Sequence, residues 1–190
     1  NEKITTICHA LSHMLEYTSS MQNGFATMEA EMVHTGNYLE LMKQRYEESF
    51  EYRIETEDSL RSVQVLKLLV QPICENCFKH GFANCEGVKR IAVTASRRSD
   101  EWTICVEDNG CGVSDEALAS FEAFKASLTP TNLRQKMNET TIGGLAMTNI
   151  CLRLRLCYGE RYRFEMENTG RGTKVTLGGQ INDSDGHRGG

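Results

Sequence analysis

The stretch that decides the fold is Asp108-Asn109-Gly110-Cys111-Gly112. It places a carboxylate and then two spaced glycines directly after an alternating apolar segment, which predicts a strand. Asn-Gly is a common turn dipeptide, so a plain β-turn is one interpretation. The other is a binding pocket, because a carboxylate can accept a hydrogen bond from an exocyclic amine such as adenine N6, and glycines let the backbone approach a flat ring. Taken alone, the loop leaves both interpretations open.

The segments around this loop predict a mixture of strands and helices. Period-two alternation predicts strands at 50–54, 90–96, 102–107, 162–167 and 174–177. Helices are expected at 63–81, 114–126 and 145–158, and a mobile polar loop at 127–141. The short connection between the second and third strands favours antiparallel pairing. Pro72 is expected to kink or restart the first of these helices.

A polar stripe on the segment 63–81 is the second candidate for chemistry. Asn76, Lys79 and His80 have the i, i+3, i+4 spacing that places side chains on one helical face. An amide oxygen can ligate Mg²⁺ and an ammonium can neutralise phosphate. The plainer interpretation of such a stripe is the solvated face of a helix.

Two further glycine-containing stretches complete the set. Gly143 and Gly144 stand before Leu145 at the expected start of a helix, where free N–H groups and the helix dipole can bind phosphate; a hinge without ligand fits equally well. Gly172-Thr173 enters the last strand, and the Thr173 hydroxyl can join Asp108 at the edge of a base, although Gly-Thr alone is uninformative.

The first 48 residues predict two helices. One seam is formed by Ile4, Ile7, Leu11, Met14 and Thr18, and the other by Met28, Met32, Thr35, Leu39, Met42 and Tyr46. Such 3/4 spacing favours a helical hairpin whose seams pair with a partner helix, within one chain or between two. A hairpin that packs only on its own domain is the alternative.

Composition excludes several classes of protein. The net charge of −5 disfavours a nucleic-acid partner, and the longest apolar run is interrupted by polar residues, so no direct membrane contact is expected. The eight cysteines are scattered, as expected for reduced thiols that pack in the interior. Cys74 and Cys77 have a spacing found in zinc sites, but without a second ligand pair they are interpreted as packing residues.

Together, in this order, the four stretches resemble the Bergerat ATP-binding fold of histidine kinases, DNA gyrase, Hsp90 and MutL. The resemblance covers residues 50–177 and implies an α+β fold, a two-layer α/β sandwich with a mixed, largely antiparallel sheet. Within that superfamily, 71–76, 79–81, 149–150, 153–154 and 158–159 resemble the LytS-type sensor histidine kinases, and so do 38–40 and 45–46 of the second helix.

The resemblance implies roles for individual residues. Asn76 would hold Mg²⁺, Lys79 and His80 would lie at the phosphates, and Glu75 can serve as a base for an acceptor histidine. Asp108 would read adenine, with Gly110, Gly112 and Thr173 shaping the base pocket. Gly143, Gly144 and Leu145 would face the phosphates beneath a lid.

Three departures from the family pattern refine this expectation. His9 and His13 lack the acceptor motif, so the phosphorylated histidine is expected upstream of Asn1. Pro72 stands where hydrolytic members carry a general-base glutamate, which disfavours simple ATP hydrolysis. Ile142 and Ala146 replace glycines at the helix entrance.

The sequence therefore predicts a helical hairpin at 1–48, an ATP-binding kinase domain at 49–180 and a disordered tail at 181–190. The expected function is γ-phosphoryl transfer from ATP, with Mg²⁺, to a histidine and then to a response regulator. We expect a homodimer formed through the helical region and a cytoplasmic location within a bacterial plasma-membrane protein. The alternatives are a non-catalytic ATP-sensing module and, more remotely, a serine kinase of the anti-sigma type.

Overall fold

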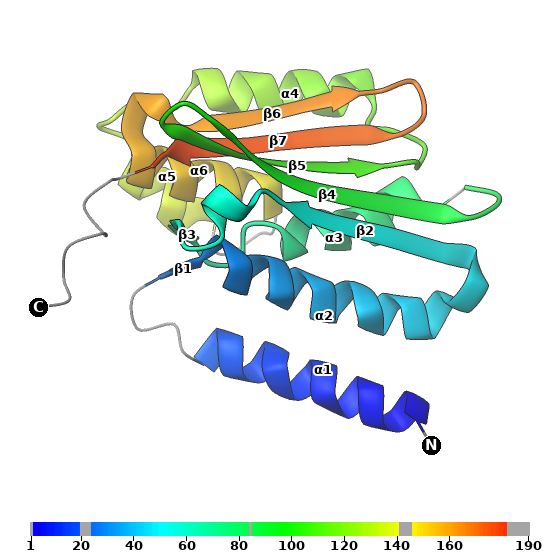
Figure 1. Cartoon of the computed structure of the whole chain (residues 1–190). Helices are drawn as coiled ribbons and strands as arrows, with labels where there is room; N and C mark the ends of the chain where they lie inside the picture. Colours follow the sequence, from blue (N-terminus) through cyan, green and yellow to red (C-terminus); the bar gives the residue numbers. More distant parts are fainter. Residues whose placement is uncertain (1, 20–23, 84, 141–145, 182–190) are drawn as a thin grey trace, which may run out of the picture.

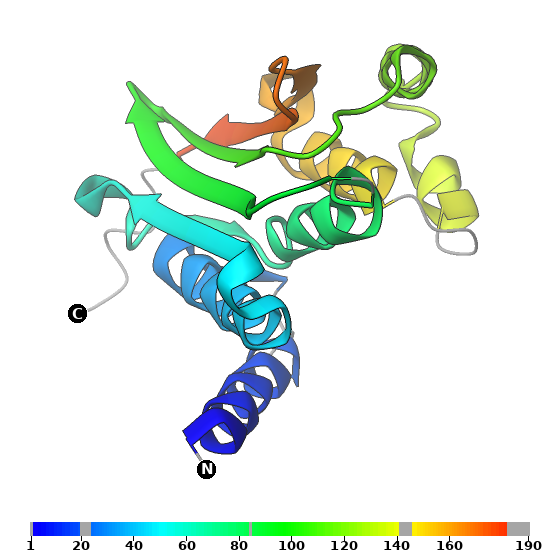
Figure 2. The same ribbon diagram turned by 90° about the vertical axis from the view of Figure 1, so that its right-hand side faces the viewer.

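The computed structural model describes residues 2–19, 24–83, 85–140 and 146–181. One sheet lies over a layer of helices, and helix α1 lies outside that layer, on the far side of α2 from the sheet (Figures 1 and 2). No helix among the described residues is long and apolar enough to cross a membrane.

The elements follow one another in a mixed α and β order. The helices are α1 (Glu2–Ser19), α2 (Met28–Tyr46), α3 (Gln71–Asn76), α4 (Asp115–Ala126), α5 (Leu133–Thr140) and α6 (Ala146–Tyr158). A π-helical turn, η4 (Cys77–Gly81), continues α3, and short 3-10 turns are η2 (Glu47–Ser49), η3 (Asp58–Leu60) and η5 (Gly159–Arg161). The strands are β1 (Phe25–Thr27), β2 (Phe50–Thr56), β3 (Gln64–Leu66), β4 (Lys89–Arg98), β5 (Glu101–Asp108), β6 (Arg163–Asn168) and β7 (Thr173–Gln180).

The main sheet has the order β2-β4-β5-β7-β6. Strands β2 and β4 are parallel, and the other neighbours are antiparallel. The expected hairpins are confirmed, and so is the mixed, largely antiparallel sheet. The central strand β5 ends at Asp108, so this residue lies at the end of the strands where the pocket opens.

One face of the sheet and the helical layer share the hydrophobic core. Along β4 and β5 buried and half-exposed residues alternate, as expected for a sheet with one covered face. Trp102 of β5, Phe50 of β2 and Phe164 of β6 are among the largest completely buried side chains. Trp102 packs edge to face on Tyr158 of α6, with 5.7 Å between the ring centroids, and so joins the sheet to the helix that follows the glycine pair.

The predicted seam of α2 is buried largely against its own domain, which is the alternative that the sequence left open. Met28, Met32 and Leu39 belong to the core of the sheet domain rather than to a seam between two helices. On α1, Ala10 is buried against the rest of the protein, whereas Ile4 and Leu11 of the predicted seam are exposed. The α2 seam thus serves the domain, because the adjacent sheet offers a larger apolar surface than the single helix α1.

Two expectations about local structure were wrong. Residues 63–81 do not form one long helix: 64–66 form β3, which pairs with β1, and helix α3 begins only at Gln71. Pro72 therefore lies in the first turn of α3, where a missing N–H costs nothing. The polar stretch 127–141 contains helix α5. Of the tail expected at 181–190, Ile181 is buried directly after β7 and donates its N–H to the Asp100 carbonyl at 2.7 Å, and residues 182–190 lie outside the described residues.

Candidate nucleotide site

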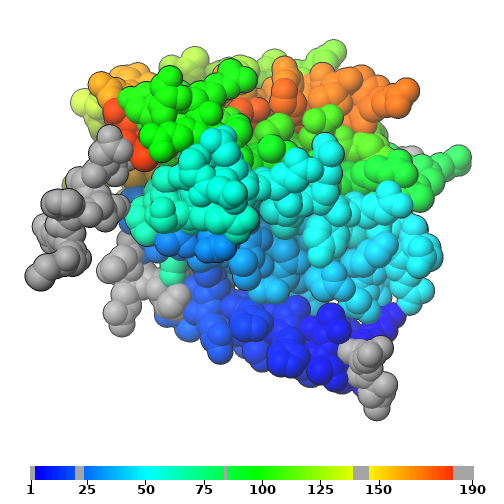
Figure 3. Space-filling view, viewed as in Figure 1, coloured from blue at the N-terminus to red at the C-terminus, as the bar shows by residue number. Residues whose placement is uncertain are grey.

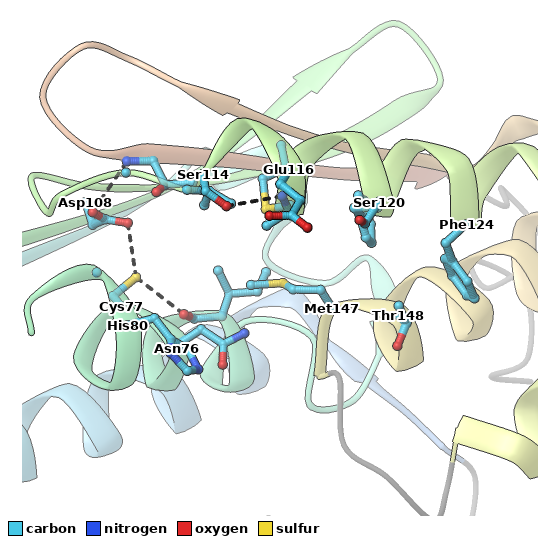
Figure 4. Close-up of a pocket in the computed structure, with 18 residues that line it drawn as sticks. Asn76, Cys77, His80, Asp108, Ser114, Glu116, Ser120, Phe124, Met147 and Thr148 are labelled. Atoms are coloured by element: carbon cyan, nitrogen blue, oxygen red, sulfur yellow. Dashed lines mark hydrogen bonds between the residues drawn. The ribbon is translucent and has the colours of Figure 1, made fainter.

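A cavity of about 700 Å³ lies between helix α4 on one side and the α3–η4 segment and α6 on the other (Figure 4). Of the predicted site residues, Asn76, His80, Asp108, Gly112 and Thr173 line it. Residues from three widely separated parts of the sequence thus meet at one cavity. Gly143, Gly144 and Leu145 lie outside the described residues.

Asp108 is held in place at the inner end of this cavity. Its side chain belongs to a residue that is only 7% exposed. Oδ1 accepts hydrogen bonds from the backbone N–H of Gly110 at 2.7 Å and of Thr173 at 3.4 Å. Oδ2 lies 3.5 Å from Sγ of Cys77. Because a carboxylate oxygen has two acceptor positions, Oδ2 can still accept a hydrogen bond from a ligand amine.

Cys77 is a pocket residue that sequence reasoning interpreted as packing alone. Its thiol is almost completely buried, and Sγ also lies 3.3 Å from the Ile73 carbonyl oxygen, so the single S–H can donate either to that oxygen or to Asp108. Burial raises the pKa of the Cys77 thiol well above its usual value, with the Cys74 and Asp108 groups adding to the rise. The thiol therefore stays protonated and acts as a weak donor toward Asp108.

The loop after Asp108 is more than a turn. Asn109 links it to the start of β4, since its side chain accepts from the Arg90 N–H at 2.6 Å and donates to the Val88 carbonyl at 2.9 Å. The backbone then crosses close to η4, where the Cys111 N–H donates to the Gly81 carbonyl at 2.8 Å. A Cβ atom on Gly110 would overlap that same carbonyl oxygen. Gly110 therefore packs against the backbone beside the pocket and does not line the pocket itself.

Gly112 has a second reason to be glycine. Its φ of +79° lies in the left-handed region, and an added Cβ would come within 2.8 Å of Oδ1 of Asn168. Asn168, at the end of β6, accepts from the Val113 N–H at 2.8 Å and donates to the Val113 carbonyl at 2.7 Å. Sequence reasoning missed this side chain, which fixes the exit of the loop across 55 residues of sequence.

The polar stripe on α3 and η4 is only partly as expected. Asn76 and His80 line the cavity, but Lys79 does not, and its ammonium lies 3.4 Å from the Glu75 carboxylate. The cause is the π turn, in which the Phe82 N–H bonds the Cys77 carbonyl five residues earlier. A π turn is wider than an α turn, so three-residue spacing no longer places two side chains on the same face. The other oxygen of Glu75 accepts from the Gln71 amide at 2.9 Å.

Helix α4 and the start of α6 also line the cavity, and sequence reasoning gave the described residues of these two helices no role in the site. The wall residues are Ser114, Glu116, Ala117, Ser120, Phe121, Phe124, Met147 and Thr148. The small residues face the cavity next to two phenylalanine rings, as in a pocket for a flat, largely apolar ring. The Ser114 N-cap, which accepts from the Ala117 N–H at 3.2 Å, was confirmed as the helix start. The spacing of Ala117, Ser120 and Phe124 along one face of α4 was the available signal.

The donor set indicates what kind of cation the cavity can hold. Among the described residues no cluster of three or more His, Cys, Asp or Glu side chains could hold a metal ion. Besides Asp108, the cavity offers the oxygen donors of the Asn76 amide and the Glu116 carboxylate, together with several hydroxyl groups. This set fits Mg²⁺, which proteins commonly bind through one or two side chains together with substrate phosphates. Cys74 and Cys77 are both buried thiols, and burial also raises the pKa of Cys74.

With this geometry established, comparison with known proteins assigns the family. Residues 62–181 match the family described as histidine kinase-, DNA gyrase B-, and HSP90-like ATPase. The chain belongs to this ATPase family. Residues 1–50 match a second family, described as histidine kinase.

Curated proteins similar to this chain include the LytS sensor proteins of staphylococci. Sensor histidine kinase/phosphatase LytS of Staphylococcus aureus strain MRSA252 is 30% identical over 148 residues, or 77% of this chain and 24% of that protein. The chain spans about a quarter of the length of the curated relatives it matches. The predicted likeness to LytS-type histidine kinases is therefore confirmed.

Solved structures of the family agree with the fold. The catalytic domain of histidine kinase ThkA has a TM-score of 0.54 at 13% identity, covering 83% of this chain and 95% of that chain. ThkA in complex with the response regulator TrrA gives 0.54 at 12% identity, covering 97% of this chain and 50% of that chain. At these identities the likeness concerns the fold alone, and it confirms the α+β, Bergerat-type architecture.

Proposed function

We propose that this chain is the ATP-binding catalytic region of a two-component sensor histidine kinase, which transfers the γ-phosphoryl group of ATP to a histidine. The observation that carries the proposal is the buried Asp108 carboxylate at a cavity of about 700 Å³, with Gly110 and Gly172 packed closely against Asp108. A carboxylate there can accept a hydrogen bond from the exocyclic amine of a base such as adenine. Family membership supports the same ligand.

The remaining predicted residues have proposed roles at the other end of the nucleotide. Asn76 and His80 line the cavity away from Asp108, so we assign Asn76 to Mg²⁺ and His80 to the phosphates. Lys79 would have to leave Glu75 to reach a phosphate, which costs little because an exposed ion pair contributes little stability. Gly143, Gly144 and Leu145 complete the proposed phosphate site directly before α6.

Transfer to a protein histidine, rather than to water, is favoured by two features. Pro72 stands one turn before Asn76 and has no group that could activate water. Glu75 is bonded by Gln71 and Lys79, and we propose that it serves as the base for the incoming histidine once Lys79 has moved to phosphate. Positioning and charge neutralisation would then provide most of the catalysis.

The helical segment supports the proposed homodimer. Ile4, Leu11 and Leu15 are 59%, 47% and 69% exposed and lie along one stripe of α1, the outermost helix (Figure 3). Large apolar side chains repeated in this way favour burial against a second copy. We propose a response regulator as the final acceptor, by analogy with the ThkA–TrrA complex. A cytoplasmic location in a bacterial plasma-membrane protein is part of the same proposal, since both ATP and the regulator are found there.

A phosphotransfer experiment tests this function. The chain is mixed with γ-labelled ATP, Mg²⁺ and a separately produced LytS-type helical segment that contains an acceptor histidine, and label on that segment is counted. We expect acid-labile label on the added segment and none on the chain alone. An Asn76→Ala variant should bind ATP more weakly and transfer less.

The outcome separates the two readings of the site. ATP binding without transfer to any supplied histidine segment would favour a non-catalytic ATP-sensing module, the second candidate. Absence of ATP binding would refute both.

A further inference from the structure

A completely buried carboxylate lies outside the nucleotide cavity, in helix α2. Glu31 is 0% exposed, and its carboxylate accepts hydrogen bonds from three consecutive backbone N–H groups. These belong to Leu68 at 2.9 Å, Leu69 at 2.7 Å and Val70 at 3.0 Å. The phenol of Tyr17, in α1, donates to the same carboxylate at 2.5 Å. A buried carboxylate is stable only when its oxygens are bonded in this way, so four donors from two regions are tied to one group.

The backbone of residues 67–70 is shaped to present these donors. Leu68 has a φ of +57°, a conformation that a leucine rarely adopts. Its N–H faces Glu31, while its carbonyl accepts from the Arg153 guanidinium of α6 at 3.2 Å. Arg153 also donates to the Lys67 carbonyl. The strained turn is therefore held by two charged groups: the Glu31 carboxylate accepts from its N–H groups, and the Arg153 guanidinium donates to its carbonyls.

This turn leads directly into the helix of the nucleotide site. Val70 is the N-cap of α3, and its carbonyl accepts from the N–H groups of Ile73 at 3.0 Å and Cys74 at 3.1 Å. Ile73, Asn76 and Cys77 further along line the cavity. Any shift of the Glu31 carboxylate would thus be transmitted to the start of α3 through bonds of ordinary length, one helical turn from the cavity.

The phenol of Tyr17 is suited to stay a donor. Burial and the neighbouring Glu31 carboxylate raise the pKa of Tyr17 far above its usual range. The Lys67 ammonium lies 4.9 Å from the centre of the Tyr17 ring and the His34 ring stacks on it at 4.3 Å. The bond between α1 and the Glu31 carboxylate is therefore made within a packed, partly buried polar cluster.

We propose that Tyr17 and Glu31 are positioning residues for the nucleotide site: Glu31 holds the 68–70 turn and the start of α3, and the Tyr17 hydroxyl makes that support depend on the position of α1. The part concerning ATP rests on the proposed function, while the part concerning α3 does not. Movement of α1, the helix with the exposed apolar stripe, would then change how Asn76 and Cys77 are presented to the cavity.

The chain contains a matched control. Tyr52 of β2 donates to the Glu40 carboxylate of α2 at 3.0 Å, so it too joins a tyrosine to a glutamate of the same helix. Burial, helped by that bond, raises the pKa of Tyr52 to about 12. Glu40 has no bond to the 68–70 turn among those found in the described residues. Tyr52→Phe and Glu40→Gln therefore reproduce the chemical change of Tyr17→Phe and Glu31→Gln without the connection to α3.

The test combines amide hydrogen exchange without nucleotide and calorimetric titration with ATP and Mg²⁺, on the whole chain. For Tyr17→Phe we expect exchange at the Leu68–Val70 amides and in α3 to accelerate about tenfold, with the β5 and β7 amides unchanged. The ATP Kd should rise by about fivefold, the lower end of measured couplings between sites. Glu31→Gln should exceed both effects. Tyr52→Phe and Glu40→Gln should leave both readouts within about twofold.

These outcomes distinguish a positioning role for Tyr17 and Glu31 from a general contribution to stability. Uniform loosening of sheet and α3 amides in Tyr17→Phe, an ATP Kd equal to that of the unaltered chain, or equal effects in Tyr52→Phe would overturn the proposal. Tyr17→Phe is conservative enough to fold even if Glu31→Gln does not. If Asp108→Asn still binds ATP, the nucleotide assignment fails instead, and the exchange pattern alone decides whether Tyr17 and Glu31 position α3.

Discussion

Replacing Asp108 by asparagine changes one atom at the inner end of the cavity. The side-chain carbonyl of asparagine can keep the acceptor role of Oδ1 toward Gly110 and Thr173. The amide NH₂ then takes the place of Oδ2, beside the Cys77 thiol. The acceptor that we propose for the adenine amine becomes a donor, while size and backbone contacts are preserved.

The expected magnitude follows from this exchange. A hydrogen bond to a charged group contributes about 1.5–3 kcal/mol. Its loss alone weakens binding by roughly 10- to 150-fold, at about 1.4 kcal/mol per factor of ten. Two donors facing each other at a residue only 7% exposed add a desolvation cost of about 1–3 kcal/mol. The ATP Kd should thus rise by a factor of about 100 or more, which abolishes binding in an ordinary titration.

Calorimetry with ATP and Mg²⁺ measures the effect, and circular dichroism with thermal unfolding verifies the fold. Glu107→Gln is the matched control, because Glu107 is the preceding residue, exposed on the other face of β5. We expect it to bind ATP like the unaltered chain. Unchanged ATP affinity in a folded Asp108→Asn protein would refute the assignment of this cavity to the adenine base.

Three further perturbations test the surroundings of the site. Gly110→Ala places a Cβ on the Gly81 carbonyl, so the unfolding free energy should fall by about 1–3 kcal/mol and ATP binding should weaken. Burial lowers the pKa of His34, and the nearby Glu31 and Gln71 side chains offset part of this decrease. At the same pH the folded protein therefore binds fewer protons than the unfolded chain, in which a histidine has a pKa of about 6.5. Stability should therefore be retained above that pH and fall below it, and His34→Phe, which can keep the stack on Tyr17, should reduce the fall measured by denaturant unfolding between pH 7 and 5. Burial raises the pKa of Cys77, so iodoacetamide should leave this thiol unlabelled in the folded protein, as mass spectrometry would report.

Each of these predictions has a control in the same chain. Gly36→Ala adds a Cβ that meets only Ile54, at an ordinary 3.5 Å, and should change ATP affinity little. His13→Asn alters an exposed histidine and should keep the acid sensitivity. The exposed Cys111 should be alkylated readily. Equal stability of Gly110→Ala, an unchanged pH slope in His34→Phe, or rapid labelling of Cys77 would contradict the corresponding contact.

Local patterns predicted most elements correctly where burial on one face leaves a clear period. The alternation in β4 and β5, the Ser114 cap of α4 and the 3/4 spacing of α2 all depend on neighbours in the sequence, and all were found. The prediction of one helix over 63–81 was wrong because the apolar residues of this segment are buried on more than one side. A long, mainly apolar run has no period that distinguishes a strand from a helix. Helix α5 was missed because its apolar face is narrow and its polar residues resemble those of a loop.

By itself, the sequence determined the order of the motifs: an Asn-bearing helix, a strand ending in Asp108 and two glycines, and a Gly-Thr strand, which together indicate the Bergerat-type ATPase. This information is local, because each motif depends on chain geometry over a few residues. Only the tertiary structure decided which side chains meet. In the folded chain the π turn directs Lys79 away from the cavity, and Asn168 is hydrogen-bonded to the loop after Asp108. Glu31 accepts hydrogen bonds from the turn before α3. Such contacts depend on the packing of distant segments, and no spacing along the chain specifies them.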